Sequence, residues 1–233
     1  MPLTGERTGP DVEAENYWFR RHEVAYRFAA DRLRGPILDA GCGEGYGAAM
    51  LASTAHPVVG VELDGLTARH AASSYPSIRV TRADACGLPF RTGTFGGAVA
   101  LQVLEHLWCP EEFVAAVREV LRPDGTLVLS TPNRPTFSPG GVRNPFHTHE
   151  YTAEEVRGVL ERSFRFVDVL GVRSGLYLRS LDVLAAGSLQ QLLMGTPFEE
   201  LPSKLRTGIG MVRAGHFTIG EAEGSLDLLA VAS

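Results

Sequence analysis

The segment Pro36–Gly47, PILDAGCGEGYG, decides the fold of this chain. A short apolar run ends in Asp39, glycine then recurs at every second position from Gly41 to Gly47, and the apolar run AAML follows. This order predicts a strand, a tight turn and a helix. Glycine adopts positive φ and lets the backbone come close to a ligand, so we expect a ligand to lie against this turn.

A glycine-rich turn between a strand and a helix is also the fingerprint of dinucleotide-binding domains. Two features favour a different ligand. The third glycine of that fingerprint falls at Tyr46, and Asp39 brings a carboxylate close to the place of a pyrophosphate. Because like charges repel and opposite charges attract, the turn suits a ligand that carries an amine cation.

Length and composition indicate an ordinary globular protein with one α/β domain and a modest appendage. The chain has 233 residues, 44% hydrophobic and 21% charged, and a formal net charge of -5, which argues against a wide nucleic-acid surface. Cys42, Cys86 and Cys109 have no CxxC spacing, so neither a disulfide framework nor a zinc site is indicated. No stretch resembles a signal peptide or a membrane span, and a cytoplasmic location is the default expectation.

Four further strands follow the first in alternation with helix-like segments. They are expected at Pro57–Leu63, Ile78–Ala83, Ala98–Val103 and Thr126–Ser130. This alternation predicts an α/β fold with a doubly wound, mostly parallel sheet, in which ligands bind beyond the carboxyl ends of the strands. Glu62, at the end of the second strand, is placed to accept hydrogen bonds from ribose hydroxyls.

The run Asp39-Ala-Gly-Cys-Gly-Glu-Gly45 resembles the first motif of class I S-adenosylmethionine-dependent methyltransferases. Later segments follow in that family's order from Pro36 to Val172, with a last strand at Ser225–Ala232. The resemblance implies the Rossmann-like methyltransferase fold of seven strands, with residues 1–35 as an N-terminal arm and helix, residues 36–233 as the cofactor-binding domain and residues 174–222 as an insert between the last two strands.

S-adenosylmethionine is the cofactor that the resemblance implies, and it assigns residues to it. Asp84, after the third strand, matches the acid that accepts from the adenine amino group, and Leu88-Pro89-Phe90 is a candidate floor for the ring. The expected cofactor-binding residues are Asp39, Gly41, Gly43, Gly45, Glu62, Asp84, Ala85 and Gln102.

A cluster of acid and histidine residues is expected at the acceptor side. Glu105 and His106 follow the fourth strand, and His147 and His149 precede a helix that the capping box of Thr152 and Glu155 predicts. In one chemistry Glu105, His106 and His147, with the amide oxygen of Gln102, hold Mg²⁺. In another, one of the three histidines is a general base. In a third, the Glu-His pair is only a helix entrance.

The metal hypothesis has its own resemblance. The pattern is similar to metal-assisted O-methyltransferases of the ubiquinone-biosynthesis type and to small-RNA 2′-O-methyltransferases, in which a distal histidine lies five residues before a threonine, as His147 lies before Thr152. Those families have a glutamate where this chain has Gln102, so one ligand charge is lost.

Two segments outside the sheet are candidate covers for the site. In the expected helix Ala14–Leu33, Val24 and Phe28 fit core packing, whereas Tyr17, Trp18 and His22 fit a lid over the cofactor as well as they fit the core. The insert contains an apolar run, Leu178–Met194, that we expect to be one helix. It predicts a lid and acceptor pocket, with a homodimer contact as the competing use.

The expected reaction is methyl transfer to a hydroxyl of a small polar acceptor, and the polar, histidine-rich mouth favours a sugar. The segment from Asn144 to Thr152 looks like that of bacterial methyltransferases of polysaccharide and glycolipid assembly, and the chain also resembles actinobacterial sugar O-methyltransferases, including those of mycobacterial polysaccharides. The alternatives are a metal-independent methyltransferase of a quinone or lipid precursor, an RNA 2′-O-methyltransferase, and a cofactor-binding subunit without catalysis.

Overall fold

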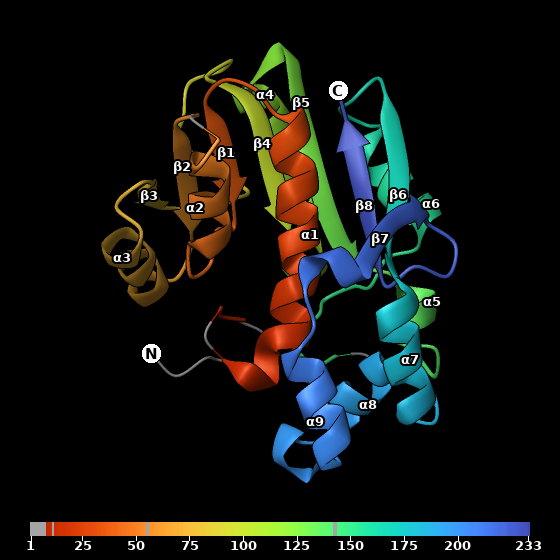
Figure 1. Ribbon diagram of the computed structural model, residues 1–233. Helices are drawn as coiled ribbons and strands as arrows, with labels where there is room; N and C mark the ends of the chain where they lie inside the picture. The colour runs from red at the N-terminus through yellow and green to blue at the C-terminus, as the bar shows by residue number, and fades with distance from the viewer. Residues whose placement is uncertain (1–7, 11, 55, 142–143) are drawn as a thin grey trace.

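The computed structural model describes residues 8–10, 12–54, 56–141 and 144–233 (Figure 1). In this part of the chain eight strands form one sheet in the order β3-β2-β1-β4-β5-β8-β6-β7. Strands β1 to β5 pair in parallel, whereas β8 runs antiparallel to both β5 and β6, and β7 runs antiparallel to β6. The strands are β1 Ile37–Ala40, β2 Val58–Glu62, β3 Arg79–Arg82, β4 Phe95–Leu101, β5 Leu121–Pro132, β6 Val167–Ser174, β7 Phe217–Glu221 and β8 Asp227–Ala232.

Helices cover both faces of the sheet and its carboxyl-terminal end. The α-helices are α1 Asn16–Arg32, α2 Tyr46–Ala52, α3 Gly65–Ser74, α4 Pro110–Val120, α5 Arg134–Phe137, α6 Ala153–Leu160, α7 Leu176–Leu184, α8 Leu189–Gly195 and α9 Ser203–Gly210. Short 3₁₀ turns occur at Glu13–Glu15, Leu104–His106, Phe198–Glu200 and Ala214–His216. Figure 1 shows α7, α8 and α9 grouped beyond the end of the sheet toward which β4 and β5 point.

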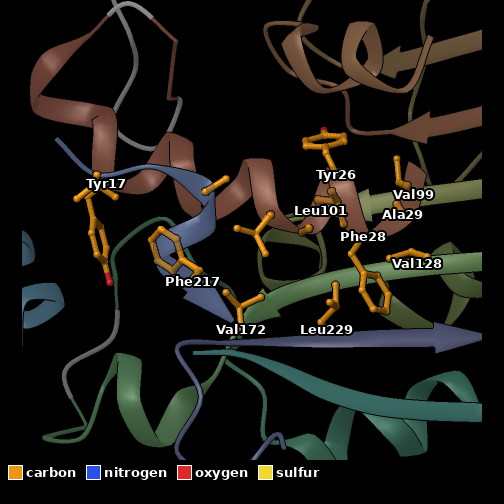
Figure 2. Packing of buried hydrophobic residues seen from close by; sticks show 14 of the residues in the cluster. Tyr17, Tyr26, Phe28, Ala29, Val99, Leu101, Val128, Val172, Phe217 and Leu229 are labelled. Atoms are coloured by element: carbon orange, nitrogen blue, oxygen red, sulfur yellow. The ribbon is translucent and has the colours of Figure 1, made fainter. Parts of the chain in front are cut away.

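Two hydrophobic cores lie on opposite faces of the sheet because alternate residues of a strand point to opposite sides. Val99 of β4 and Val128 of β5 belong to the core under α1, together with Phe28 and Leu229 (Figure 2). Their neighbours in the strands belong to the second core, which α4 and α6 cover. This three-layer arrangement confirms the doubly wound α/β fold that the sequence predicts.

The structure corrects two details of the predicted organisation and confirms a third. The sheet has eight strands instead of seven, because β7 lies within the predicted insert and pairs with β6. The run Leu178–Met194 is two helices instead of one. Ala186 has a φ of 54° between them, and the side chain of Ser188 caps α8 by accepting a hydrogen bond from the backbone of Gln191. The capping box of Thr152 and Glu155 at α6 is confirmed.

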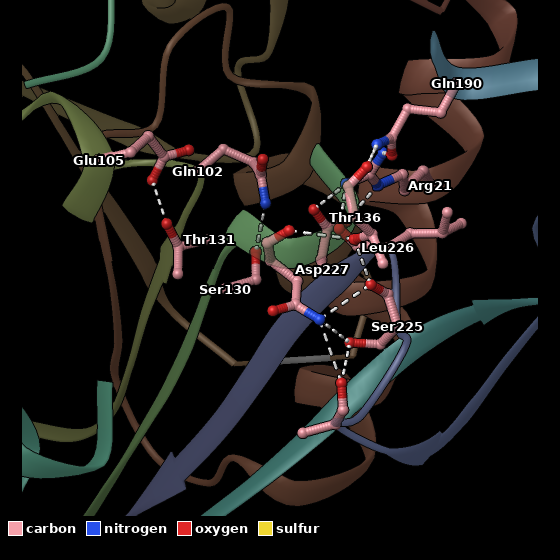
Figure 3. A network of polar contacts seen from close by, with 12 residues as sticks. Arg21, Gln102, Glu105, Ser130, Thr131, Thr136, Gln190, Ser225, Leu226 and Asp227 are labelled. Atoms are coloured by element: carbon pink, nitrogen blue, oxygen red, sulfur yellow. Dashed lines mark hydrogen bonds and ion pairs between the residues drawn. The ribbon is translucent and has the colours of Figure 1, made fainter. Parts of the chain in front are cut away.

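A buried ion pair joins α1, β8 and α8 (Figure 3). The guanidinium of Arg21 donates to both carboxylate oxygens of Asp227, to Oε1 of Gln190 at 2.6 Å and to the carbonyl of Leu226 at 2.8 Å. All three charged or amide side chains are buried. Removing one charge would leave the other in a medium that solvates ions poorly, so this cluster fixes the insert to the N-terminal helix and the sheet.

Replacing one member of this ion pair is expected to destabilise the fold strongly. For Arg21→Met we expect the free energy of unfolding to fall by about 3–5 kcal/mol, because Asp227 then keeps a buried charge without its partner. The same substitution at Arg27, which is 67% exposed and pairs with Glu23 on the same helix, is the matched control, with an expected loss below about 1 kcal/mol. Urea unfolding of the two variants measures both values, and equal losses would contradict the role given to Arg21.

Candidate functional site

The glycine-rich turn after β1 forms one wall of a cavity of about 460 Å³. Gly41, Gly43 and Gly45 all have positive φ, which explains the repeated glycines. They differ in what surrounds them. A Cβ at Gly41 would meet Val103 at 2.5 Å and one at Gly45 would meet Ala71 at 2.8 Å, whereas nothing lies within 4 Å of a Cβ at Gly43. The open side of Gly43 is therefore where a ligand can approach the backbone.

Asp39 lies behind this wall instead of on it. It is fully buried and is not among the residues that line the cavity, although Tyr26, whose hydroxyl donates to its Oδ2 at 3.1 Å, is. The other carboxylate oxygen, Oδ1, has no hydrogen-bond partner among the described residues. Burial raises the pKa of Asp39 to about 7, with the Tyr26 hydroxyl opposing the shift.

Glu62, Asp84 and Ala85 line the cavity as predicted, whereas Leu88, Pro89 and Phe90, the candidate floor for the adenine, are not among its lining residues, and the ring of Phe90 packs against Phe95. Glu62 accepts from the backbone of Gly43 at 3.1 Å and of Asp64 at 2.8 Å, so the β2 carboxylate also holds the glycine turn in place. Asp84 and Ala85 line the cavity after β3, and Asp84 accepts from the backbone of Cys86 at 2.9 Å.

The charge of this cavity argues against a dinucleotide ligand. Glu44, Glu62 and Asp84 line it, and none of the described residues that line it is Arg or Lys. The three carboxylates repel a pyrophosphate and attract a cation.

A second cavity of about 510 Å³ adjoins the first. The two share Thr8, His22, Gln102, His106 and Phe146, so these side chains surround the boundary between them. Apolar side chains from three helices line a further part of the second cavity: Trp18 of α1, Phe137 of α5, and Leu193 and Met194 of α8. Leu193 and Met194 belong to α8 of the insert, so the insert forms part of this wall.

Glu105, His106 and His147 meet at the second cavity. Each offers one ligand atom, and these atoms lie within 4.8 Å of one another. Glu105 is buried, and its Oε2 accepts from the hydroxyl of Thr131 at 2.9 Å (Figure 3). Burial raises the pKa of Glu105 to about 7, and the two neighbouring histidines oppose that rise. A cation beside Glu105 would therefore stabilise the ionised form of its carboxylate.

Both histidines are oriented by a hydrogen bond at Nδ1. His106 Nδ1 lies 3.0 Å from the carbonyl oxygen of Phe146, which can only accept, so Nδ1 carries the proton. His147 Nδ1 lies 3.1 Å from Oε1 of Glu150, a buried acid. In an imidazole ring that is protonated at Nδ1, Nε2 carries the lone pair. A histidine whose other nitrogen is held by a carbonyl or carboxylate is typical of metal ligands and of general bases.

The structure separates His149 from these three residues. Its ring packs against Tyr151 at 4.5 Å between centroids and its Nε2 lies 3.6 Å from Glu155, in a different cavity. His149 is therefore not placed to act with Glu105.

Gln102 lines both main cavities, but its amide nitrogen donates to Ser130 at 3.1 Å.

The three residues predicted to form a lid lie in two different environments. Trp18 and His22 line the second cavity, whereas Tyr17 is buried and packs against Phe217 (Figure 2).

Three residues of the site were not singled out from the sequence. Tyr26 contacts Asp39, Glu150 orients His147, and Thr8 contacts His22 and Tyr46 at 3.3 and 3.1 Å. The spacing of His147 and Glu150, three residues apart, is the one signal that could have indicated a pair.

Comparisons with known proteins identify the family of this chain. A family model described as a methyltransferase domain matches residues 38–129. A probable S-adenosylmethionine-dependent methyltransferase of Mycolicibacterium smegmatis is 42% identical over 100% of this chain and 95% of its own length. One of Mycobacterium tuberculosis is 40% identical over 100% of this chain and 89% of its own.

Among solved structures, a methyltransferase of Thermotoga maritima described as a possible histamine N-methyltransferase has a TM-score of 0.63 at 17% identity, covering 93% of this chain and 92% of that one. This likeness supports the fold alone. The mycobacterial relatives, which match all of this chain and most of their own length, show that the chain belongs to the S-adenosylmethionine-dependent methyltransferases.

Proposed function

We propose that this methyltransferase transfers the methyl group to a hydroxyl of a sugar that binds in the second cavity. The observation that carries the proposal is the convergence of Glu105, His106 and His147 on that cavity, next to its boundary with the first. In the reaction the acceptor oxygen attacks the methyl carbon, the carbon–sulfur bond breaks, and the hydroxyl proton leaves. Alignment across the boundary between the cavities would supply much of the acceleration.

The first cavity is the proposed cofactor site. Gly43 offers open backbone, Glu62 is placed for the ribose and Asp84 for the adenine. The sequence predicts that Asp39 contacts the cofactor, but its side chain lies behind the cavity wall. Its proposed role is therefore to stabilise the cationic methionine end of the cofactor with a buried negative charge. Its Oδ1, which has no partner among the described residues, is the oxygen that would respond to the ligand.

Cofactor binding is expected to depend on pH through Asp39. Its pKa is about 7, so its ionised fraction rises between about pH 6 and pH 8, and S-adenosylhomocysteine, which keeps the ammonium group, should bind more tightly as the pH rises. Calorimetry in buffers of different ionisation enthalpy should show a proton released on binding.

The variant Asp39→Asn is expected to bind S-adenosylhomocysteine about 10-fold or more weakly at pH 8, because it removes the buried negative charge proposed to stabilise the ammonium group, and 10-fold corresponds to about 1.4 kcal/mol. Its residual binding should lose the pH dependence. The control is Asp124→Asn, an exposed acid in the turn within β5. If the wild-type protein binds S-adenosylhomocysteine with equal affinity at about pH 6 and about pH 8, this role of Asp39 is contradicted.

The acceptor cavity is the proposed site of a divalent cation bound by Glu105, His106 and His147. The donor set fits such an ion, because both histidines have Nδ1 engaged and Glu105 is a buried acid with a raised pKa. Two imidazoles beside one carboxylate favour a first-row transition ion over the Mg²⁺ expected from the sequence. A bound ion would lower the pKa of an acceptor hydroxyl. Without it, Nε2 of either histidine would have to take the proton.

Binding of Mn²⁺ tests the ion site without an acceptor. Electron paramagnetic resonance should show loss of the free-ion signal at one ion per chain, and no such loss for His147→Ala. For Glu150→Gln we expect about 10-fold weaker binding, since a residue that orients a metal-binding histidine typically contributes that much. Glu154→Gln, the same change at an exposed position in α6, is the matched control. If wild-type protein leaves the Mn²⁺ signal unchanged, the histidines act as bases without a metal.

The lining of the second cavity supports a sugar acceptor. Trp18, Phe137 and Phe146 offer flat apolar surfaces, and Gln102, Asn144 and the Glu-His cluster offer hydrogen-bonding groups. Arg21 also reaches this cavity, but it is paired with Asp227. The cavity therefore presents the carboxylates of Glu15 and Glu105 without an unpaired arginine among its described residues, which favours a neutral acceptor over an anionic one.

Methyl transfer from labelled cofactor to a fractionated extract of the source cells tests the acceptor class. Mass spectrometry is expected to find the new methyl group on a saccharide hydroxyl, and His147→Ala should lose that product. A methyl group found instead on RNA, on a quinone precursor or on nitrogen would contradict the proposal.

Two other sequence expectations stay predictions. The homodimer contact of the insert is one, and the cytoplasmic location is the other. Within the described residues no helix combines the length and hydropathy needed to cross a membrane.

A further inference from the structure

An open groove of about 480 Å³ lies outside both cavities, between α4 and α6. The loop after β4 and the segment before α6 form one end of it. Its lining includes Trp108, Glu111, His149, Tyr151, Gly158 and Arg162. The methyltransferase reaction as derived above uses none of these side chains.

Trp108 is the most exposed large hydrophobic side chain in the described part of the chain. Its relative exposure is 88%, so almost the whole indole faces solvent beside the groove. Tryptophan usually buries much of its large apolar surface, and it is enriched where a partner covers it. On the other side of the groove the rings of His149 and Tyr151 meet edge to face.

Gly158 keeps the floor of the groove open. It lies inside α6, its φ is not in the left-handed region, and nothing lies within 4 Å of where a Cβ would be. Neither backbone conformation nor packing therefore requires glycine here, although glycine is about 1 kcal/mol less favourable than alanine inside a helix. A larger side chain at this position would project into the space that the groove now leaves open.

Polar groups lie around the aromatic surface, and the ion pairs between them are long. The ion pairs Arg162–Glu111 and His149–Glu155 are 3.7 and 3.6 Å long, which is longer than a hydrogen bond. Both carboxylate oxygens of Glu155 already accept hydrogen bonds, from Arg134 and from the backbone of Thr152, so Arg162, Glu111 and His149 are the groups of this edge that we expect to bind hydroxyl groups. A flat apolar face with hydrogen-bonding groups at its edge matches a pyranose ring, which has one face of C–H groups and hydroxyls around its rim.

The groove is directly connected to the catalytic segment. Leu107 lines both the cofactor cavity and the groove, and Trp108 follows it. The hydroxyl of Thr148, which lines the groove, donates to the carbonyls of Glu105 at 3.0 Å and of Leu107 at 2.7 Å. We propose that this groove is a saccharide subsite that binds an outer sugar unit of an oligosaccharide acceptor, with Trp108 as its stacking surface. This inference rests on the proposed sugar acceptor.

The two tryptophans of the chain report the two sites separately. Trp18 lines the acceptor cavity and Trp108 the groove, so protein labelled with 5-fluorotryptophan should give two ¹⁹F resonances, which Trp108→Phe assigns. Maltotetraose and mannotetraose are the probes, and sorbitol, which has no ring, is the control. We expect at least one tetrasaccharide to shift the Trp108 resonance saturably, and sorbitol to leave it unchanged.

Substitutions at Gly158 make the test specific to the groove. Gly158→Leu should abolish the Trp108 shift by filling the groove, and Gly158→Ala should retain it. Both replace glycine by a better helix former, so thermal stability should not fall. A Trp108 resonance that neither tetrasaccharide moves, or that moves equally in Gly158→Leu, would overturn the subsite. A shift of the Trp18 resonance alone would contradict the subsite but not the proposal of a sugar acceptor. Methylation of a compound that is not a saccharide would contradict the proposal of a sugar acceptor.

Discussion

Attraction between buried carboxylates and a cation is the interaction on which this site depends. Asp39 and Glu105 both lie just beyond or at the carboxyl end of a parallel strand, both are buried, and burial raises the pKa of each to about 7. Keeping such groups ionised costs free energy unless a positive charge approaches. In the proposed function the two carboxylates act at different cavities: Asp39, from behind the wall of the first, on the charged cofactor, and Glu105, in the second, on an ion or a developing charge at the acceptor.

The proposed cofactor site and the proposed acceptor site meet at the boundary between the two cavities. Thr8 and His22 come from the N-terminal part of the chain, Gln102 and His106 from the segment after β4, and Phe146 from the segment before α6. The Arg21 ion pair attaches α8 to the same framework, and α8 completes the acceptor wall. The family fold therefore supplies the cofactor cavity, whereas the parts added around it shape the acceptor cavity.

Strong local patterns made the central part of the fold predictable from sequence. The glycine turn, the strands β1 to β4 and the capping box of α6 each depend on neighbouring residues. The meeting of Glu105, His106 and His147 was predicted from the resemblance to metal-assisted O-methyltransferases. β7 was missed because it is a five-residue edge strand with Gly220 inside it. The break after α7 was missed because the leucine spacing continues across Ala186, a good helix former in an unusual conformation.

The other contacts between distant segments of the site were not predictable, because neither a local pattern nor a resemblance indicated them. Tyr26 fits a core helix face equally well whether or not its hydroxyl meets Asp39, and Arg21 gives no sign of its partner 206 positions away. The depth of Asp39 behind the cavity wall likewise depends on the packing of α1 over the turn. These contacts set the electrostatics of the site.

A ¹³C NMR titration of the aspartate and glutamate carboxyl groups, with and without S-adenosylhomocysteine, tests the central claim most directly. In the unliganded protein the Asp39 carboxyl is expected to titrate near pH 7, and bound S-adenosylhomocysteine should move its midpoint well below that value. An Asp39 that titrates at the ordinary value of an aspartate without ligand, or whose midpoint the ligand leaves unchanged, would contradict the account.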